Sequence, residues 1–180
     1  MFRRKLIWEK SFGGSGSDVM YSINPTNDSG IIMAGKSPSS DGDVTENNGS
    51  SDFWIIKLDN LNNIEWEKSY GGSGNDVANS IMQTSDNGYI VAGYSNSSDG
   101  DKTVAYGGND FWVLKLDANG DLEWEKNYGG TSSDGSRTIQ VTTDGGYILA
   151  GGTFSDDGDV TSNNGSEDIW IIKLDSNGNL

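Results

Sequence analysis

Aspartate-rich segments carry the side chains best suited to chemistry in this sequence of 180 residues. Counting Asp41 as position 1, oxygen-bearing side chains stand at positions 1, 3, 5, 7 and 12, as Asp41, Asp43, Thr45, Asn47 and Asp52. Such a set suits calcium, a hard cation that takes about six to eight oxygen ligands. The pattern recurs twice, as Asp99, Asp101, Thr103 and Asp110, and as Asp157, Asp159, Thr161 and Asp168. Calcium is therefore the one candidate cofactor, with these residues as its ligands.

Turn formation without a metal is the alternative interpretation of these segments. The loop lacks the glycine that an EF-hand needs at position 6, and it ends in aspartate rather than glutamate. Asp-Gly-Asp and Asn-Asn-Gly sequences form turns readily, because short polar side chains bond to nearby backbone groups. Asp18, Asp76 and Asp134 each follow a Gly-Gly pair, where bonding to the neighbouring backbone is the simpler role.

Catalysis has little support in the residue types present. The chain has no cysteine and no histidine, which removes thiolate nucleophiles, the usual zinc sites and the commonest general base. A glycosidase needs one privileged pair of carboxylates, whereas the carboxylates here recur in every repeat. Glu46, Arg137 and Glu167 are the single-copy residues that an enzyme or a unique pocket could use. We therefore expect a non-catalytic binding or structural module, with a glycoside-acting enzyme and a passive scaffold fragment as alternatives.

The chain consists of three copies of one unit. Trp8, Trp66 and Trp124 each begin a Trp-Glu-Lys sequence, and 66 − 8 and 124 − 66 are both 58. The segment 52–59 and the Gly-Gly and Ala-Gly pairs recur at the same step, with no insertion or deletion between copies. Strict spacing predicts a stacked array rather than domains on linkers. We place the repeats approximately at 13–70, 71–128, and 129–180 together with 1–12.

Each copy is predicted to form four β-strands. In the second copy they cover 78–84, 89–95, 111–116 and 122–128, with tight turns at Asn87-Gly88 and Asn119-Gly120 and a long loop over 96–109. Runs such as Phe53-Trp54-Ile55-Ile56 are typical of strands covered on both faces. The Ala-Gly pair in the second strand indicates a place where backbones approach closely.

A small four-stranded sheet covered on both faces is the blade of a β-propeller. The predicted fold class is therefore all-β, a β-propeller of three four-stranded antiparallel blades in one domain over 1–180. A β-solenoid is the main rival, but its turns are usually much shorter than this repeat.

The tryptophans fall into two groups. Those inside apolar runs are predicted to lie in the core, and those on the outermost strands are predicted either to pack between neighbouring strands or to stack on a sugar. The first group is Trp54, Trp112 and Trp170, and the second is Trp8, Trp66 and Trp124.

Loops of such a blade alternate between its two ends. The Asp-rich loop after the second strand and the Gly-rich loop after the fourth strand share one end, which we call the Asp/Gly-rich end. Long loops carry binding more often than short ones. This end is therefore the predicted ligand-binding face, with Asp18, Asp76, Asp134 and Arg137 as its candidate residues.

The pattern Trp-Ile-Ile-Lys-Leu-Asp, Asn-Gly, Leu-Glu-Trp-Glu-Lys, Gly-Gly, then Gly-Tyr-Ile-Val-Ala-Gly resembles the β-propeller repeats of large bacterial secreted and cell-surface proteins. The resemblance covers the whole chain and implies the propeller fold. It implies an extracellular or cell-surface location and brings no catalytic residues. For the binding module itself, a cell-surface or carbohydrate-related role is the finer expectation. The first copy departs most, with Asn24-Pro25 and with Ile31 in place of tyrosine.

The ends of the sequence predict how the array closes. Leu180 is the counterpart of Leu6, since 6 + 3 × 58 is 180, so the third copy lacks a fourth strand and 6–12 is a spare one. In one hypothesis two chains form a six-bladed ring, each giving its N-terminal strand to the other's last blade. In the other, the chain is part of a longer propeller whose further blades come from a parent chain.

Charge and hydropathy limit the partners. A formal net charge of −15 argues against nucleic acids and anionic membrane surfaces, which attract basic proteins. Met1 to Lys5 is basic, but the apolar run after it is too short for the core of a signal peptide, and no segment reaches transmembrane length.

Overall fold

The computed structural model describes residues 7–180, and this part of the chain contains eleven β-strands and no helix. The all-β prediction is therefore confirmed. The strands are β1 Val19–Pro25, β2 Ile31–Ser37, β3 Asp52–Leu58, β4 Ile64–Tyr70, β5 Asp76–Gln83, β6 Tyr89–Ser95, β7 Asp110–Leu116, β8 Leu122–Tyr128, β9 Asp134–Val141, β10 Tyr147–Thr153 and β11 Asp168–Leu174.

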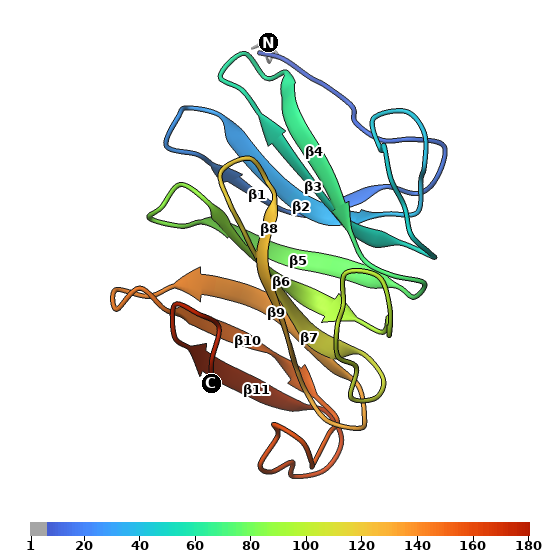
Figure 1. Ribbon diagram of the computed structural model, residues 1–180, viewed down its shortest axis with the longest axis vertical. Coiled ribbons are helices and arrows are strands. Elements are labelled where there is room, and N and C mark those ends of the chain that lie inside the picture. Colours follow the sequence, from blue (N-terminus) through green and yellow to red (C-terminus); the bar gives the residue numbers. More distant parts are fainter. Residues whose placement is uncertain (1–6) are drawn as a thin grey trace, which may run out of the picture.

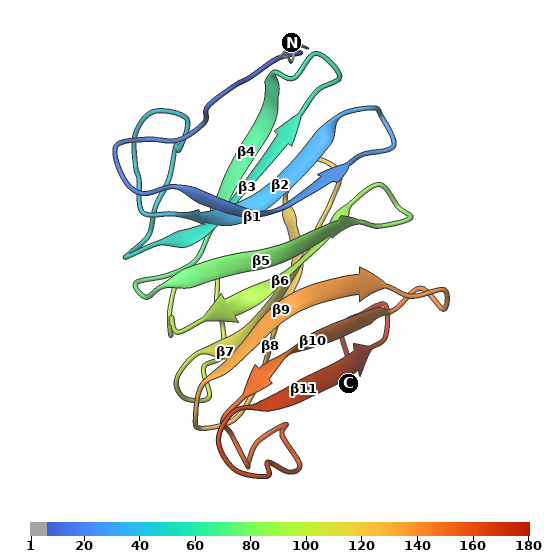
Figure 2. The same ribbon diagram turned by 180° about the vertical axis from the view of Figure 1, so that it is seen from behind.

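The strands form three antiparallel sheets that follow the repeats. The first sheet holds β1 to β4, the second β5 to β8 and the third β9 to β11, each in chain order. The sheets are stacked along the long axis, with residues 7–12 beside the first and the C-terminus beside the third (Figure 1). The view from behind shows β1, β5 and β9 as successive members of the stack (Figure 2). This arrangement is consistent with a propeller-like fold.

The predicted strands lie within two residues of the observed ones, but the turns differ. Asn87-Gly88 is not the tip of its hairpin, because the Asn87 N–H donates to the Thr84 carbonyl and Thr84 N–H to the Gly88 carbonyl. Ser85 and Asp86 therefore form the tip, and Asn87 follows with a left-handed φ of 68°. This is a three-residue hairpin loop rather than a two-residue one. Gly120, with φ of 82°, takes the same place in the β7–β8 turn.

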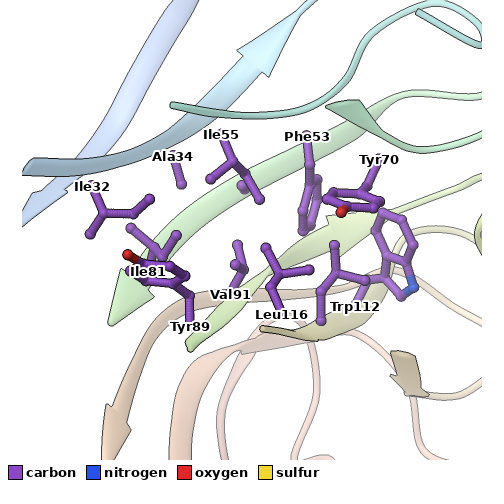
Figure 3. Packing of buried hydrophobic residues seen from close by; sticks show 12 residues of the cluster. Ile32, Ala34, Phe53, Ile55, Tyr70, Ile81, Tyr89, Val91, Trp112 and Leu116 are labelled. Atoms are coloured by element: carbon purple, nitrogen blue, oxygen red, sulfur yellow. The ribbon is translucent and has the colours of Figure 1, made fainter. Parts of the chain in front are cut away.

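The main core lies between the sheets. Ile32, Phe53 and Ile55 of the first sheet meet Ile81, Val91 and Trp112 of the second, and all are fully buried (Figure 3). The Phe53 and Trp112 ring centroids are 4.7 Å apart. Phe111 and Trp170 repeat this contact between the second and third sheets, also at 4.7 Å. Such aromatic pairs add about 1 kcal/mol each beyond the apolar area that they bury.

The outer tryptophans pack between sheets, as one of the two interpretations predicts. The ring of Trp66 lies 5.6 Å from that of Tyr89 in the next sheet, and Trp124 lies 6.1 Å from Tyr147. Trp8 is the exception, since it is 48% exposed.

The third sheet has three strands, so the predicted absence of its fourth strand is confirmed for residues 7–180. The expectation that the N-terminal strand completes this sheet does not hold within one chain. Residues 7–12 form no regular strand and lie beside the first sheet, where Lys10 Nζ donates to the Asn62 carbonyl and to Asn63 Oδ1. The reason is distance along the stack, because the first and third sheets lie at opposite ends of it (Figure 1). Leu6, the first residue of the predicted strand, is outside the described residues.

The Ala-Gly pair of the second strand lies where backbones approach closely, as the sequence indicates. A Cβ atom on Gly93 would fall 1.9 Å from the Val77 carbonyl oxygen and 2.9 Å from the Ala78 Cα. Gly35 and Gly151 are equally confined by the neighbouring first strand.

We expect Gly93→Ala to lower the free energy of unfolding by about 1 to 3 kcal/mol, because backbone must move to admit the methyl group. The matched control is Gly135→Ala, whose Cβ would meet nothing closer than Tyr94 at 3.6 Å and should change stability by less than about 0.5 kcal/mol. Urea denaturation measures both. Equal losses for the two variants would show that the close approach at Gly93 is unimportant.

Candidate functional site

A Gly-Gly turn bound to aspartates is the repeated unit of the Asp/Gly-rich end. Between the first and second sheets, three consecutive backbone N–H groups donate to three carboxylates. Gly71 N donates to Asp101 Oδ2 at 3.0 Å, and Gly72 N to Asp76 Oδ2 at 2.9 Å. Ser73 N then donates to Asp99 Oδ1 at 2.7 Å. The turn is thus held by the Asp-rich loop of the sheet that it leads into.

The same three hydrogen bonds occur in all three sheets. The donors Gly13, Gly14 and Ser15 pair with Asp43, Asp18 and Asp41 at 3.0, 2.8 and 2.7 Å, and Gly129, Gly130 and Thr131 pair with Asp159, Asp134 and Asp157 at 3.2, 2.8 and 2.8 Å. The structure therefore brings together the aspartates that the sequence assigned to two separate groups. In each sheet their carboxylates face backbone N–H groups, which is the turn role considered above.

Glycine is required where this turn meets the loop. Gly100 has φ of 68°, and a Cβ atom there would lie 2.2 Å from the Gly71 carbonyl oxygen. A Cβ atom on Gly72 would lie 2.4 Å from the carbonyl oxygen of Asp99. A side chain at either position would push the turn away from its carboxylates.

Three carboxylates gather around Gly71, at the junction of the first and second sheets. A Cβ atom on Gly71 would lie 2.5 Å from both Asp52 Oδ1 and Asp76 Oδ2, and Asp101 bonds to the Gly71 N–H. Burial raises the pKa of Asp52 to about 6, with the charges of Asp76 and Asp101 adding to the effect and the Asn48 N–H opposing it. Among the described residues, the Oδ1 atoms of Asp52 and Asp76 have no hydrogen-bond partner.

At the junction of the second and third sheets, Asp110 takes the place of Asp52, and its carboxylate is paired with a lysine. Lys102 Nζ lies 3.2 Å from Asp110 Oδ2, and both side chains are fully buried. Asn127 Nδ2 donates to the same oxygen at 3.0 Å. Valine stands at the position of Lys102 in the other copies, as Val44 and Val160. Sequence reasoning missed this ion pair, although the replacement of an apolar residue by lysine in one copy was its visible signal.

Two of the predicted threonine ligands hydrogen-bond to the outer strand of their own sheet. Thr45 Oγ1 donates to Glu67, whose other oxygen accepts the Trp54 indole N–H at 2.9 Å. Thr103 and the Trp112 indole bond in the same way to Glu125, with 2.9 Å for the indole. The outer-strand glutamate therefore ties the Asp-rich loop to the core tryptophan of its own sheet.

No group of three or more carboxylate side chains is placed to hold a metal ion among residues 7–180. Asp52, Asp110 and Asp168 instead accept the N–H groups of Asn48, Tyr106 and Asn164. Calcium binding by the twelve loop residues stays a prediction.

The single-copy residues lie apart from one another. Arg137 and Glu167 line an open hollow of about 400 Å³ on the third sheet, beside Gly152 and Ile169. Glu46 lines a different hollow on the first sheet, with Glu67 and Lys68. The structure thus places Arg137 in one hollow with Glu167 and Asp168, and it does not join Glu46 and Glu167 in one site.

Comparison with known proteins gives one distant relative. The chain is 26% identical to the regulatory protein FlaEY of Caulobacter vibrioides over 191 residues, which is 96% of this chain and 20% of that protein. The chain therefore spans about a fifth of the length of this relative. No protein-family model matches it. Among residues 7–180 there is no helix long and apolar enough to cross a membrane.

Asp52 should make the stability of the protein fall as pH rises from about 4 to about 6.5. Its pKa is higher in the folded protein than in the unfolded chain, so the folded state binds more protons in this range and the advantage is lost as pH passes the folded pKa. We expect this to cost about 1 to 3 kcal/mol in free energy of unfolding. In Asp52→Asn the loss should shrink, because the amide still accepts the Asn48 N–H and does not ionise. Urea denaturation at several pH values measures both proteins, and identical slopes would contradict the assignment.

The two interpretations of the Asp-rich loops differ in their response to calcium. Because the carboxylates already accept backbone N–H groups, we expect the melting temperature to be the same in excess calcium and in EDTA. Asp99→Asn should lower it equally in both conditions. A calcium-dependent rise that Asp99→Asn removes would instead establish these loops as calcium sites.

Proposed function

We propose that this chain is a non-catalytic β-propeller module that acts by binding or by joining other parts, and that the Asp/Gly-rich end is its ligand-binding face. The observation that carries the non-catalytic part of the proposal is the equivalence of the three repeats at this end, and the choice of this end as the binding face rests on its long loops. In each sheet three backbone N–H groups donate to three carboxylates at equivalent positions, which makes nine such hydrogen bonds in all. Residues with this use hold a scaffold in place, whereas catalysis needs one distinct set of groups.

The comparison with FlaEY supports this coarse reading. That relative is named as a regulatory protein, which fits action through binding rather than turnover. The low identity and the small share of FlaEY that is covered keep its own role from passing to this chain in any finer detail. On the repeat pattern alone, we propose that this chain belongs with the β-propeller repeats of bacterial secreted and cell-surface proteins.

A glycoside-acting enzyme is the second candidate, and the hollow at Arg137 is what favours it. Arg137 and Glu167 occur there once, beside an exposed apolar surface. A retaining or inverting glycosidase nevertheless needs a pair of carboxyl groups across the scissile bond, and the second single-copy glutamate, Glu46, lines another hollow.

We expect the protein to release no product from a panel of reporter glycosides, and Arg137→Ala to behave in the same way. The reason is that Asp168, the other carboxylate of this hollow, accepts the Asn164 N–H and recurs in every copy, which leaves Glu167 without a distinct second carboxylate. Binding to a glycan array, measured in parallel, reports on the ligand-binding face without requiring turnover. Product release by the unaltered protein that falls in Arg137→Ala would replace the binding proposal with the enzyme.

A further inference from the structure

The third sheet exposes a face that is buried in the other two. On the first sheet, Ile32, Ala34, Phe53 and Ile55 are fully buried against the second, and their counterparts Ile90, Ala92, Phe111 and Val113 are fully buried against the third. The counterparts on the third sheet are Ile148, Ile169 and Ile171, which are 38%, 83% and 60% exposed, with Ala150 between them. The hollow at Arg137 belongs to this face, since Ala150 and Ile169 line it.

The first sheet presents the complementary face at the other end of the stack. Trp112, Leu114 and Leu116 of the second sheet pack against the first. Their counterparts Trp54, Ile56 and Leu58 form a separate cluster on the outer side of the first sheet. They are buried there within the chain, whereas Met20 and Ile31 at the edge of the cluster are only partly buried. Ile23 of β1 is 64% exposed, whereas its counterpart Ile81 is fully buried.

Residues 7–12 lie on this outer face as the fourth strand of a preceding sheet would. Lys10 Nζ donates to Asn63 Oδ1 at 3.2 Å, which repeats the contact of Lys68 Nζ with Asp121 Oδ1 at 2.8 Å, since 68 − 10 and 121 − 63 are both 58. Phe12 packs on the cluster of the first sheet, as Tyr70 does on that of the second. The segment thus occupies the place of a fourth strand without a sheet of its own.

In the part of the chain that the structure describes, the third sheet lacks the fourth-strand glutamate of the other two sheets, and the segment over 7–12 carries its counterpart. In the first two sheets a glutamate of the fourth strand accepts the indole N–H of the core tryptophan and the hydroxyl of the loop threonine. The side chains of Trp170 and Thr161 have no such partner among residues 7–180, where β11 is an open edge. The counterpart of the missing glutamate is Glu9, since 67 − 58 is 9.

We propose that the open face and edge of the third sheet bind the first sheet and the N-terminal segment of a second copy of this chain. Residues 7–12 of that copy pair with β11 as a fourth strand, in the register that β4 has with β3. Ile171 then lies opposite the partner's Lys10, as Ile55 lies opposite Lys68. The partner's Glu9 accepts the hydrogen bonds of Trp170 and Thr161. Ile148 packs on the partner's Ile23, an exposed residue, as their counterparts Ile32 and Ile81 pack in one cluster.

Arg137 has a place in the same interface. Its counterpart Asn79 reaches across to the next sheet, where Nδ2 donates to the Ser136 carbonyl at 2.8 Å. The corresponding carbonyl of the second copy belongs to the partner's Met20, since 136 − 116 is 20. When both ends of both chains pair in this way, six sheets close on themselves with two-fold symmetry, and no apolar end face stays open. This goes beyond the proposed function, because it does not depend on what the Asp/Gly-rich end binds.

Molar mass in solution tests the pairing. By size exclusion with light scattering we expect twice the chain mass of 19.3 kDa. Ile171→Lys should give a folded protein of single-chain mass, because the residue is exposed in one chain and the charge opposes burial against the partner. The matched control is Val104→Lys, on an exposed residue of the loop between β6 and β7 outside the proposed interface, which should keep the doubled mass.

A cross-link tests the register. The chain has no cysteine, so Lys10→Cys with Ile171→Cys in one chain should form a disulfide-linked dimer on a non-reducing gel. Lys68→Cys with Ile171→Cys should not, since Lys68 lies in the strand β4 of the first sheet. A single-chain mass for the unaltered protein overturns the proposal. So does a mass that keeps growing with concentration, or a dimer that survives Ile171→Lys without forming the cross-link.

Discussion

Burial of both faces of each sheet is the constraint on which this structure depends. Ile55 and Ile56 are neighbours on β3, so their side chains point to opposite faces, and both are fully buried. A sheet of this kind is stable only between two covers. The second sheet has a neighbouring sheet on each side within the chain. The outer face of the first sheet is covered by residues that include Phe12 and Met20, and the outer face of the third sheet is exposed at Ile169 and Ile171. The strict repeat length follows from this, because each neighbour must offer the same contact, Phe53 on Trp112 and then Phe111 on Trp170.

The lysine side chains that are buried in the stack are paired with groups of opposite charge. Lys57 is buried between sheets with its Nζ 2.7 Å from Asp28 and 2.9 Å from Glu65. Burial alone would lower the pKa of Lys57, but the two carboxylates outweigh it and hold the pKa above its usual value. Removing one partner would leave a charge poorly compensated inside the stack. At the Asp/Gly-rich end, carboxylates bind backbone N–H groups instead, so much of the negative charge of the chain is structural.

The sequence predicts the sheets well because their signals are local or periodic. Trp-Glu-Lys at a constant step gives the repeat, and the apolar runs give the strands to within two residues. The prediction of the hairpin tip at Asn87-Gly88 was wrong because Asp86 accepts hydrogen bonds from Thr84 and Gly88, and the tip lies two residues earlier, at Ser85 and Asp86. Side-chain hydrogen bonds decide between a two-residue and a three-residue hairpin loop here, and the spacing of residue types in the sequence does not reveal those bonds.

The candidate site could be located but not interpreted from sequence. Its aspartates were found by their spacing, yet their partners are N–H groups of the Gly-Gly turn, some 26 to 30 residues away in sequence. Glu125 likewise accepts the Trp112 indole N–H from the neighbouring strand, a contact that the residue types alone do not indicate. Contacts between distant segments depend on how the loops fold over one another, and a pattern of residue types does not record that.

Hydrogen exchange at β11 is the most direct measurement of the central claim, that each sheet requires a neighbour on both sides and a fully paired edge. At high protein concentration the account predicts that the peptide over 168–174 is protected nearly as well as the peptide over 110–116, its counterpart in the second sheet, and that protection falls on dilution. Fast exchange of 168–174 at every concentration, with 110–116 still protected, would contradict it, because the open edge and face of the third sheet would then be its stable state.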